Sequence, residues 1–199
     1  MSPRLSALLL PLTLLAAAPA AAQFQSDSYK FLSAVRDGKG NDVIAALNKP
    51  GNTLVNTRDV STGETALHIT VRRGDTLYTR FMIEKGADVN ARDGKGDTPL
   101  ILAVVGGYDN LIPILTDAHA NPNLGNAQGE TPLILAVHRR DADMIRLLLK
   151  AGADPDQTDS LAGKSARDYA MQDTRSTMLA RLFADTPKKA KRAVAGPRL

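Results

Sequence analysis

The stretch Gly129–Val137, GETPLILAV, is nearly identical to Gly96–Val104, GDTPLILAV, which lies 33 residues upstream. A third copy, GETALHITV, begins another 33 residues upstream at Gly63, and a degraded copy, GKSARDYAM, begins at Gly163. Self-similarity at a fixed period of about 20–50 residues is typical of a stacked repeat array. The repeat therefore decides the fold, and every other part of the chain is interpreted around it.

The unit around Gly96 is predicted to begin with a short helix. Thr98 followed by Pro99 is typical of a helix start, because the threonine oxygen can cap free backbone N–H groups and proline fits the first helical position. Apolar residues then recur at helical spacing from Leu100, and Gly106-Gly107 ends the helix. Thr65 and Thr131 occupy the same position in the neighbouring units.

A second helix is predicted in the same unit, with its buried face over Leu111–Leu115 and with Asp109 as its cap. The neighbouring units follow this helix with Gly86 and Gly152, which suit the left-handed conformation that commonly ends a helix. The third unit carries His119 at that position. We therefore predict a strained or rearranged turn there.

The repeated residues resemble ankyrin repeats, through GETALH…GADVNARD, GDTPLILA and GETPLILA…GADPDQTD between residues 59 and 159. The resemblance implies an all-α solenoid of about five helix-turn-helix units joined by hairpin-like turns. Two of these units are degenerate caps, Ser28–Asn48 and Gly163–Phe183. A pair of short helices cannot bury an apolar face alone, so Leu133 is expected to be buried between stacked units.

Some positions depart from the family pattern. Only the second unit keeps the family's histidine, at His68, whose expected role is a hydrogen bond to the backbone of a neighbouring loop. Ile101 and Ile134 replace it in the next two units. Arg167 and Asp168 of the last unit stand where the internal units carry leucine and then histidine or isoleucine, as expected for a cap whose outer face meets water.

Residues 1–22 have the pattern of a secretory signal peptide. Arg4 precedes an apolar run that ends in Ala20–Ala22, which predicts cleavage before Gln23 and a periplasmic protein. The alternative, a membrane anchor, is disfavoured because the run is short and rich in alanine and proline. We expect a repeat domain over residues 23–186, followed by a basic tail over residues 187–199.

The formal charge of +4 comes from that tail and not from the repeats. Its basic residues, with no acid among them, are Lys188, Lys189, Lys191, Arg192 and Arg198. Such a tail is either a solvated terminus or a weak contact for an anionic surface. Nucleic acid is not an expected partner, because export separates the protein from it and stacking aromatics are not interleaved in the tail.

The sequence predicts no metal, cofactor or catalytic site. The chain has no cysteine, and His68, His119 and His138 fall at different positions of the repeat, so they are not expected to converge on a metal. Carboxylates could form an acid/base pair across repeats, but their periodic recurrence favours a role in turns and at helix starts. These carboxylates are Asp59, Glu64, Asp88, Asp93, Asp97, Glu130 and Asp154.

The resemblance implies a non-enzymatic, monomeric protein that binds another protein along the concave face of the array. The expected binding residues at the turn tips are Ser61, Thr62, Glu64, Gly94, Lys95, Asp97, Ala127, Gln128 and Glu130. Those at the ends of the first helices are Arg72, Arg73, Val105, His138, Arg139 and Arg140.

The two basic groups at the helix ends, in the second and fourth units, flank the uncharged step Val105–Gly107 of the third. This pattern predicts a partner with acidic patches, unless the arginines are only solvated helix ends. Two other interpretations stay open. One is an envelope-attached structural or scaffold protein held by an uncleaved signal or by the basic tail, and the other is an enzyme with an unrecognised site.

Overall fold

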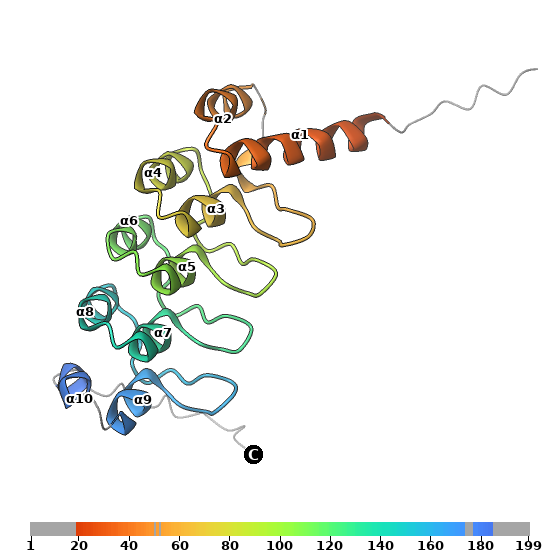
Figure 1. Ribbon diagram of the computed structural model, residues 1–199. Coiled ribbons are helices and arrows are strands. Elements are labelled where there is room, and N and C mark those ends of the chain that lie inside the picture. The colour runs from red at the N-terminus through yellow and green to blue at the C-terminus, as the bar shows by residue number, and fades with distance from the viewer. Residues whose placement is uncertain (1–18, 50, 52, 174–176, 185–199) are drawn as a thin grey trace, which may run out of the picture.

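The computed structural model describes residues 19–49, 51, 53–173 and 177–184, and over them the chain forms five stacked pairs of helices (Figure 1). The pairs are α1 Pro19–Arg36 with α2 Gly40–Leu47, α3 Ala66–Arg72 with α4 Thr76–Glu84, α5 Pro99–Gly106 with α6 Leu111–Asp117, α7 Pro132–Arg139 with α8 Ala142–Lys150, and α9 Ala166–Gln172 with α10 Thr177–Ala184. A single 3₁₀ turn, η1 Leu54–Asn56, follows the first pair. The all-α solenoid of about five units is confirmed.

The helices form two rows, and the connecting hairpins form a third row along one side of them (Figure 1). The first helices of the units, α1, α3, α5, α7 and α9, pack along one row, with α3 against α5, α5 against α7 and α7 against α9. The second helices form the other row. The hairpins project from the first helices on the side away from the second helices, so one long surface combines hairpins and first-helix ends.

The capping threonines start the first helices as the sequence predicts. The Thr98 side-chain oxygen accepts a hydrogen bond from the Ile101 N–H at 3.3 Å, and Thr131 accepts one from Ile134 at the same distance. A proline occupies the first helical position in both units. These caps satisfy backbone donors that would otherwise be buried without a partner.

The core is aliphatic and lies between neighbouring units. Leu67, Leu100 and Leu133, the same position in three successive units, are completely buried, so the expectation for Leu133 is confirmed. Burying each leucine side chain stabilises the fold by roughly 1.5–3 kcal/mol. Because the helices also pack against those of the adjacent units, the stability of each unit depends on its neighbours.

The recurrent carboxylates organise the turns. Asp59 accepts hydrogen bonds from the backbone N–H groups of Ser61 and Thr62 at 2.8 and 3.0 Å. Asp93 does the same for Lys95 and Asp97 at 2.8 and 2.9 Å. Asp88 and Asp154 each accept a bond from the N–H two residues on. The predicted turn role of these carboxylates is confirmed.

Each hairpin touches the next through one backbone hydrogen bond and a close glycine contact. The Ala127 N–H donates to the Lys95 carbonyl at 3.2 Å. Gly96 lies beside this bond at φ +79°, and a Cβ on it would come within 2.8 Å of the Ala127 nitrogen. A Cβ on Gly129 would likewise come within 2.8 Å of the Ser160 nitrogen. Only glycine satisfies both the backbone conformation and this approach.

His119 adopts the strained conformation that its position predicts. Its φ is +67°, in the left-handed region that Gly86 and Gly152 occupy at +85° and +89° in the neighbouring units. A side chain in this conformation costs roughly 1–2 kcal/mol. The helix α6 therefore ends in the same geometry as α4 and α8, but with stored backbone strain.

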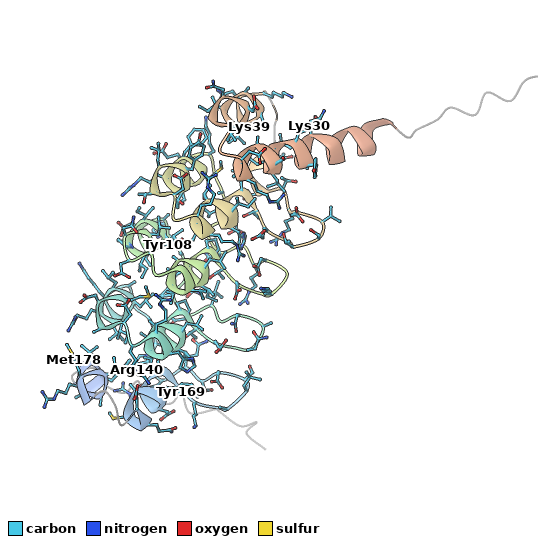
Figure 2. The ribbon with its side chains drawn as sticks, viewed as in Figure 1. Lys30, Lys39, Tyr108, Arg140, Tyr169 and Met178 are labelled. Carbon is cyan, nitrogen blue, oxygen red and sulfur yellow. The ribbon has the colours of Figure 1, made fainter. Side chains whose placement is uncertain are left out.

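The predicted cap of α6 is wrong, because the capping position falls on Asn110, which makes no side-chain cap bond. In the neighbouring units Asp75 and Asp141 cap the second helix through the N–H three residues on. Tyr108 stands at that place in the third unit (Figure 2). Its hydroxyl donates to the Arg72 carbonyl at 3.3 Å instead.

Asp109, the predicted cap of α6, has one carboxylate oxygen that is unpaired in the described part of the chain. Its Oδ1 atom is buried and has no hydrogen-bond partner among the described residues. Burial, followed by the charges of Asp141 and Asp143, raises the pKa of the Asp109 carboxyl above its usual value. The start of α6 is therefore less well stabilised than the starts of α4 and α8.

The two caps differ from the sequence expectation in detail. Helix α1 begins at Pro19, earlier than the predicted cap, because alanines favour helix and proline is tolerated in a first turn. Arg167 does not face water: it is buried, pairs with Asp156 at 2.7 Å and donates to the Phe183 carbonyl at 2.5 Å. The exposed Asp168 side chain completes a capping box with Ser165.

The predicted signal peptide and tail fall largely outside the described residues. Residues 1–18 and 187–199 are not described, and the predicted cleavage point before Gln23 lies within the first turns of α1. In the part of the chain that is described, no helix combines the length and the apolar character that crossing a bilayer requires.

Candidate functional site

The predicted binding residues fall into three groups on the hairpin side of the array. The exposed hairpin residues are Ser61, Thr62, Gly94, Lys95, Ala127 and Gln128, and the half-buried residues that precede the capping threonines are Glu64, Asp97 and Glu130. The exposed first-helix ends are Arg72, Arg73, Val105, His138, Arg139 and Arg140. Each group recurs at the same place in successive units, because the repeat positions it.

The structure brings the first two hairpins and the end of α3 together around a hollow of about 510 Å³. Its walls are formed by Ser61, Thr62, Glu64, Arg72, Asp93, Gly94 and Lys95. Six of these seven were predicted as binding residues, and Asp93 was assigned only to a turn. Its recurrence at the start of each hairpin was the available signal for this second role.

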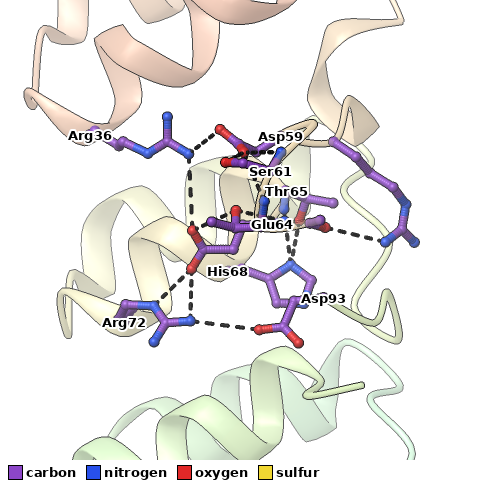
Figure 3. A network of polar contacts seen from close by, with 11 residues as sticks. Arg36, Asp59, Ser61, Glu64, Thr65, His68, Arg72 and Asp93 are labelled. Carbon is purple, nitrogen blue, oxygen red and sulfur yellow. Dashed lines mark hydrogen bonds and ion pairs between the residues drawn. The ribbon is translucent and has the colours of Figure 1, made fainter. Parts of the chain in front are cut away.

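Arg72 lies between two carboxylates in this hollow (Figure 3). Its guanidinium contacts the Glu64 carboxylate at 2.7 Å and lies 3.7 Å from the carboxylate of Asp93 in the next hairpin. Arg36, at the end of α1, contacts Asp59 at 2.6 Å and approaches Glu64 at 4.0 Å. Charges on this surface therefore alternate in sign and are paired across unit boundaries.

Asp59 is the best-stabilised carboxylate of this network. The hydroxyl of Ser61, the Arg36 guanidinium and the backbone N–H of Thr62 lower the pKa of Asp59 well below its usual value. Asp59 is therefore ionised throughout the physiological range and is unsuited to proton transfer near neutral pH. Arg36 was not predicted as part of this surface, because it lies in the degenerate cap.

His68 joins the hairpins to the helix row. Its Nδ1 accepts from the Thr65 N–H at 3.2 Å, and its Nε2 lies 3.1 Å from the Asp97 carbonyl. This pairing assigns the proton to Nε2, and it confirms the expected bond to the backbone of a neighbouring loop. Burial lowers the pKa of His68 below its ordinary value of 6.5, so the ring is neutral and structural.

Arg73 and Arg139 turn away from the hairpins and toward the preceding unit. Arg73 donates to the Val35 carbonyl at 2.7 Å, near the end of α1, and Arg139 donates to the Val105 carbonyl at 3.0 Å, near the end of α5. Cations at helix C-termini satisfy free carbonyls and favour the helix dipole. These two exposed arginines therefore stabilise the interface between units.

The last two units meet in a cluster of polar and aromatic side chains. His138 lies edge-on to the Tyr169 ring, 4.5 Å between centroids, and 4.0 Å from Glu130. The Tyr169 hydroxyl donates to Asp159 at 2.6 Å, which raises the pKa of Tyr169 to about 12 and lowers that of Asp159. Arg140 lies nearby and pairs with Asp173 at 2.5 Å (Figure 2).

The side chains on this surface form paired charges and hydrogen bonds. A tyrosine with a raised pKa is a weaker nucleophile and acid near neutral pH. Among the described residues, no group of three or more His, Cys, Asp or Glu is arranged to hold a metal ion. Polar side chains are displayed in a row along the array instead of converging on one pocket.

Helix pairs stacked beside a row of hairpins define a repeat solenoid with an extended interaction surface. The family model described as ankyrin repeats (3 copies) matches residues 31–126, and that for ankyrin repeats (many copies) matches residues 114–170. The chain therefore belongs to the ankyrin-repeat family. Repeats of this family generally act as protein–protein interaction modules and not as enzymes.

Curated relatives match only part of the array. The NF-kappa-B inhibitor cactus of Drosophila melanogaster is 39% identical over 56 residues, which cover 28% of this chain and 11% of that protein. A putative ankyrin repeat protein of Rickettsia bellii is 42% identical over 45 residues, 23% of this chain and 19% of that protein. The chain spans less than a fifth of the length of these relatives.

Proposed function

We propose that the protein binds a periplasmic protein along the concave face formed by the hairpins and the first-helix ends. The observation that carries this proposal is the hollow beside Arg72, where side chains of two successive hairpins and one helix end are displayed together. Equivalent residues recur in the next units, so one partner can contact several units at once. The signal-peptide pattern of residues 1–22 supports the periplasmic location.

We also propose that the partner carries acidic patches that approach the first-helix ends. The exposed arginines of these ends already have partners, since Arg72 pairs with Glu64 and Arg140 with Asp173. A carboxylate of the partner therefore has to share or displace an internal acceptor. Its contribution is steering and selectivity more than affinity.

The test places a photo-crosslinking amino acid on either side of the array in the protein's native cells. Lys95 and Gln128 report on the hairpin side, and Leu77 and Arg80, which are exposed on α4, are matched positions on the other side. We expect a crosslinked protein only from the hairpin positions. Crosslinks only from α4 would show that the partner binds the opposite face.

Fractionation of the same cells tests the location separately. The mature protein is expected in the periplasmic fraction with Gln23 as its first residue. A cytoplasmic protein that retains Met1 would refute the periplasmic proposal, whichever face crosslinks.

A further inference from the structure

In the second and fourth units, the residue before the capping threonine pairs with the residue at the end of the first helix. In the second unit Glu64 contacts Arg72 at 2.7 Å, and in the fourth Glu130 lies 4.0 Å from His138. Each carboxylate therefore has a basic group beside it within its own unit. Each pair therefore joins the residue that follows the hairpin to the end of the first helix.

The third unit keeps the carboxylate and lacks the basic group. Asp97 occupies the position of Glu64 and Glu130, whereas Val105 occupies the position of Arg72 and His138. Asp97 forms no ion pair within 4.0 Å in the part of the chain that the structure describes. Val105 is a valine with 53% of its surface exposed at the middle of the array.

The cations around Asp97 balance the negative charge of its carboxylate only in part. Burial and the neighbouring Asp93 raise the pKa of the Asp97 carboxyl, and they outweigh the opposing charges of Lys95 and Arg72 and a hydrogen bond from the Asn126 side chain. Arg92 donates to the Gly96 and Gly125 carbonyls, and Arg139 is held on the Val105 carbonyl and acts on Asp109. The half-buried carboxylate would therefore gain from one more cation.

The second unit shows how a guanidinium fits this place. Arg72 bonds Glu64 through Nε at 2.8 Å and through Nη2 at 2.7 Å, and it lies above the next hairpin. One unit on, the repeat register places Asp97 at the position of Glu64 and the exposed Val105 at the position of Arg72. An arginine brings a planar cation for the carboxylate and an aliphatic stem for the valine.

We propose that the third unit receives an arginine side chain of the partner protein, whose guanidinium pairs with Asp97 and whose stem lies on Val105. This inference rests on the proposed function, because it names the chemistry of the partner at the same surface. The partner then supplies the cation that Arg72 supplies in the second unit, at the position that His138 occupies in the fourth. An arginine flanked by acidic groups would also meet the basic helix ends on either side.

The experiment selects binders from a randomised displayed peptide library with the purified full chain. We expect arginine to be enriched in peptides recovered by the wild type. Enrichment should be lost with Asp97→Asn and with Val105→Arg, which places an internal guanidinium where the second unit has Arg72. Asp117→Asn and Leu77→Arg, on the second-helix side, are the matched controls and should keep the enrichment.

Affinities of one recovered peptide then isolate the contact in a double-mutant cycle. Replacing its enriched arginine by glutamine should weaken binding to the wild type by about tenfold, as expected for one charge-assisted pair. The same replacement should change binding to Asp97→Asn by less than about twofold, because the partner charge is already absent.

The possible outcomes separate this inference from the proposed function. Peptides that bind the hairpin side without arginine enrichment, or an equal loss of affinity in the wild type and Asp97→Asn, overturn the inference alone. Recovery only of peptides that bind the second-helix side overturns the concave-face proposal as well. Loss of enrichment in the Asp97 and Val105 variants, with both controls unchanged, supports the arginine site.

Discussion

The third and fourth units begin with almost the same nine residues and end very differently. GDTPLILAV and GETPLILAV start their helices with the same threonine bond and bury the same leucine completely. After the helix, the third unit continues with Val105–Gly107 and the fourth with His138–Arg140. The shared residues build the interface between units, and the variable residues lie on the surface where a partner would bind.

The comparison first predicts that substitutions of the shared core residues lower the free energy of unfolding by large and equal amounts. Leu100→Ala and Leu133→Ala should each lower the free energy of unfolding by about 2–5 kcal/mol, because both leave a cavity between units. Urea denaturation followed by circular dichroism measures this. Val105→Ala, at the exposed position, should cost under about 0.5 kcal/mol.

Removal of the tail is a second control for the same measurement. A chain that ends at residue 186 should unfold at the same urea concentration as the full chain. If its midpoint fell as far as that of Leu133→Ala, the tail would have to pack against the array, and the assignment of stability to the repeat interfaces would be wrong.

The two units also differ at the turn after the second helix. His119→Gly should stabilise the protein by about 1 kcal/mol, because it removes a left-handed histidine. The reverse change, Gly152→His, should destabilise it by a similar amount in the fourth unit. Thermal unfolding measures both. A loss of stability in His119→Gly would mean that the imidazole makes contacts whose value exceeds the backbone strain.

The second unit carries His68 where the third and fourth units carry isoleucine. This histidine predicts that the stability of the protein depends on pH. The folded protein keeps this histidine neutral, so its pKa lies below the unfolded value of 6.5. Stability is therefore complete above pH 6.5 and is lost as pH falls from 6.5 toward the folded pKa. His68→Gln should show a smaller loss between pH 7 and about pH 5. If His68→Gln lost as much stability as the wild type over this pH range, the loss would come from other titrating groups.

The smallest predicted effect concerns the one conservative difference within the nine residues. Asp97→Asn should raise the unfolding free energy at pH 7, because the raised pKa of Asp97 means that its ionised form is disfavoured in the fold. Glu130→Gln should lower it slightly or leave it unchanged. Both changes should be below about 1 kcal/mol, since solvent screens these half-exposed groups. The gain in Asp97→Asn should shrink as pH falls through the folded pKa toward the unfolded value of 3.8, and should disappear below about pH 3, where Asp97 is protonated in both states.

Local sequence rules predict the helix starts, the buried leucines, the turn carboxylates and the strain at His119, because each depends on a residue and its near neighbours. They fail for Asp109, since Tyr108 reaches back to the Arg72 carbonyl and shifts the start of α6. They also fail for Arg167, whose partners Asp156 and Phe183 come from other elements. Both failures come from contacts between segments that the repeat pattern does not contain.

The sequence predicts which positions lie on the candidate surface, but it does not predict how the charged side chains there are paired. Arg72 and Arg73 are adjacent at the end of one helix, yet Arg72 pairs with Glu64 on the hairpin side, whereas Arg73, like Arg139 at the same repeat position, donates to a carbonyl of the preceding unit. Which acceptor an exposed arginine chooses depends on its neighbours in space. The missing cation beside Asp97 becomes visible only once the pairs in the flanking units are known.

The matching glycine contacts at Gly96 and Gly129 mean that the array can change length in whole units. A Cβ added to either glycine would come equally close to the following hairpin, 2.8 Å from a backbone nitrogen. A chain lacking residues 97–129 would join Gly96 directly to Glu130 and regenerate GETPLILAV after it, so the Lys95 carbonyl would meet the Ser160 N–H. The protein would become shorter by about one helix diameter, roughly 10 Å, with one new junction between the second and fourth units and the other junctions kept.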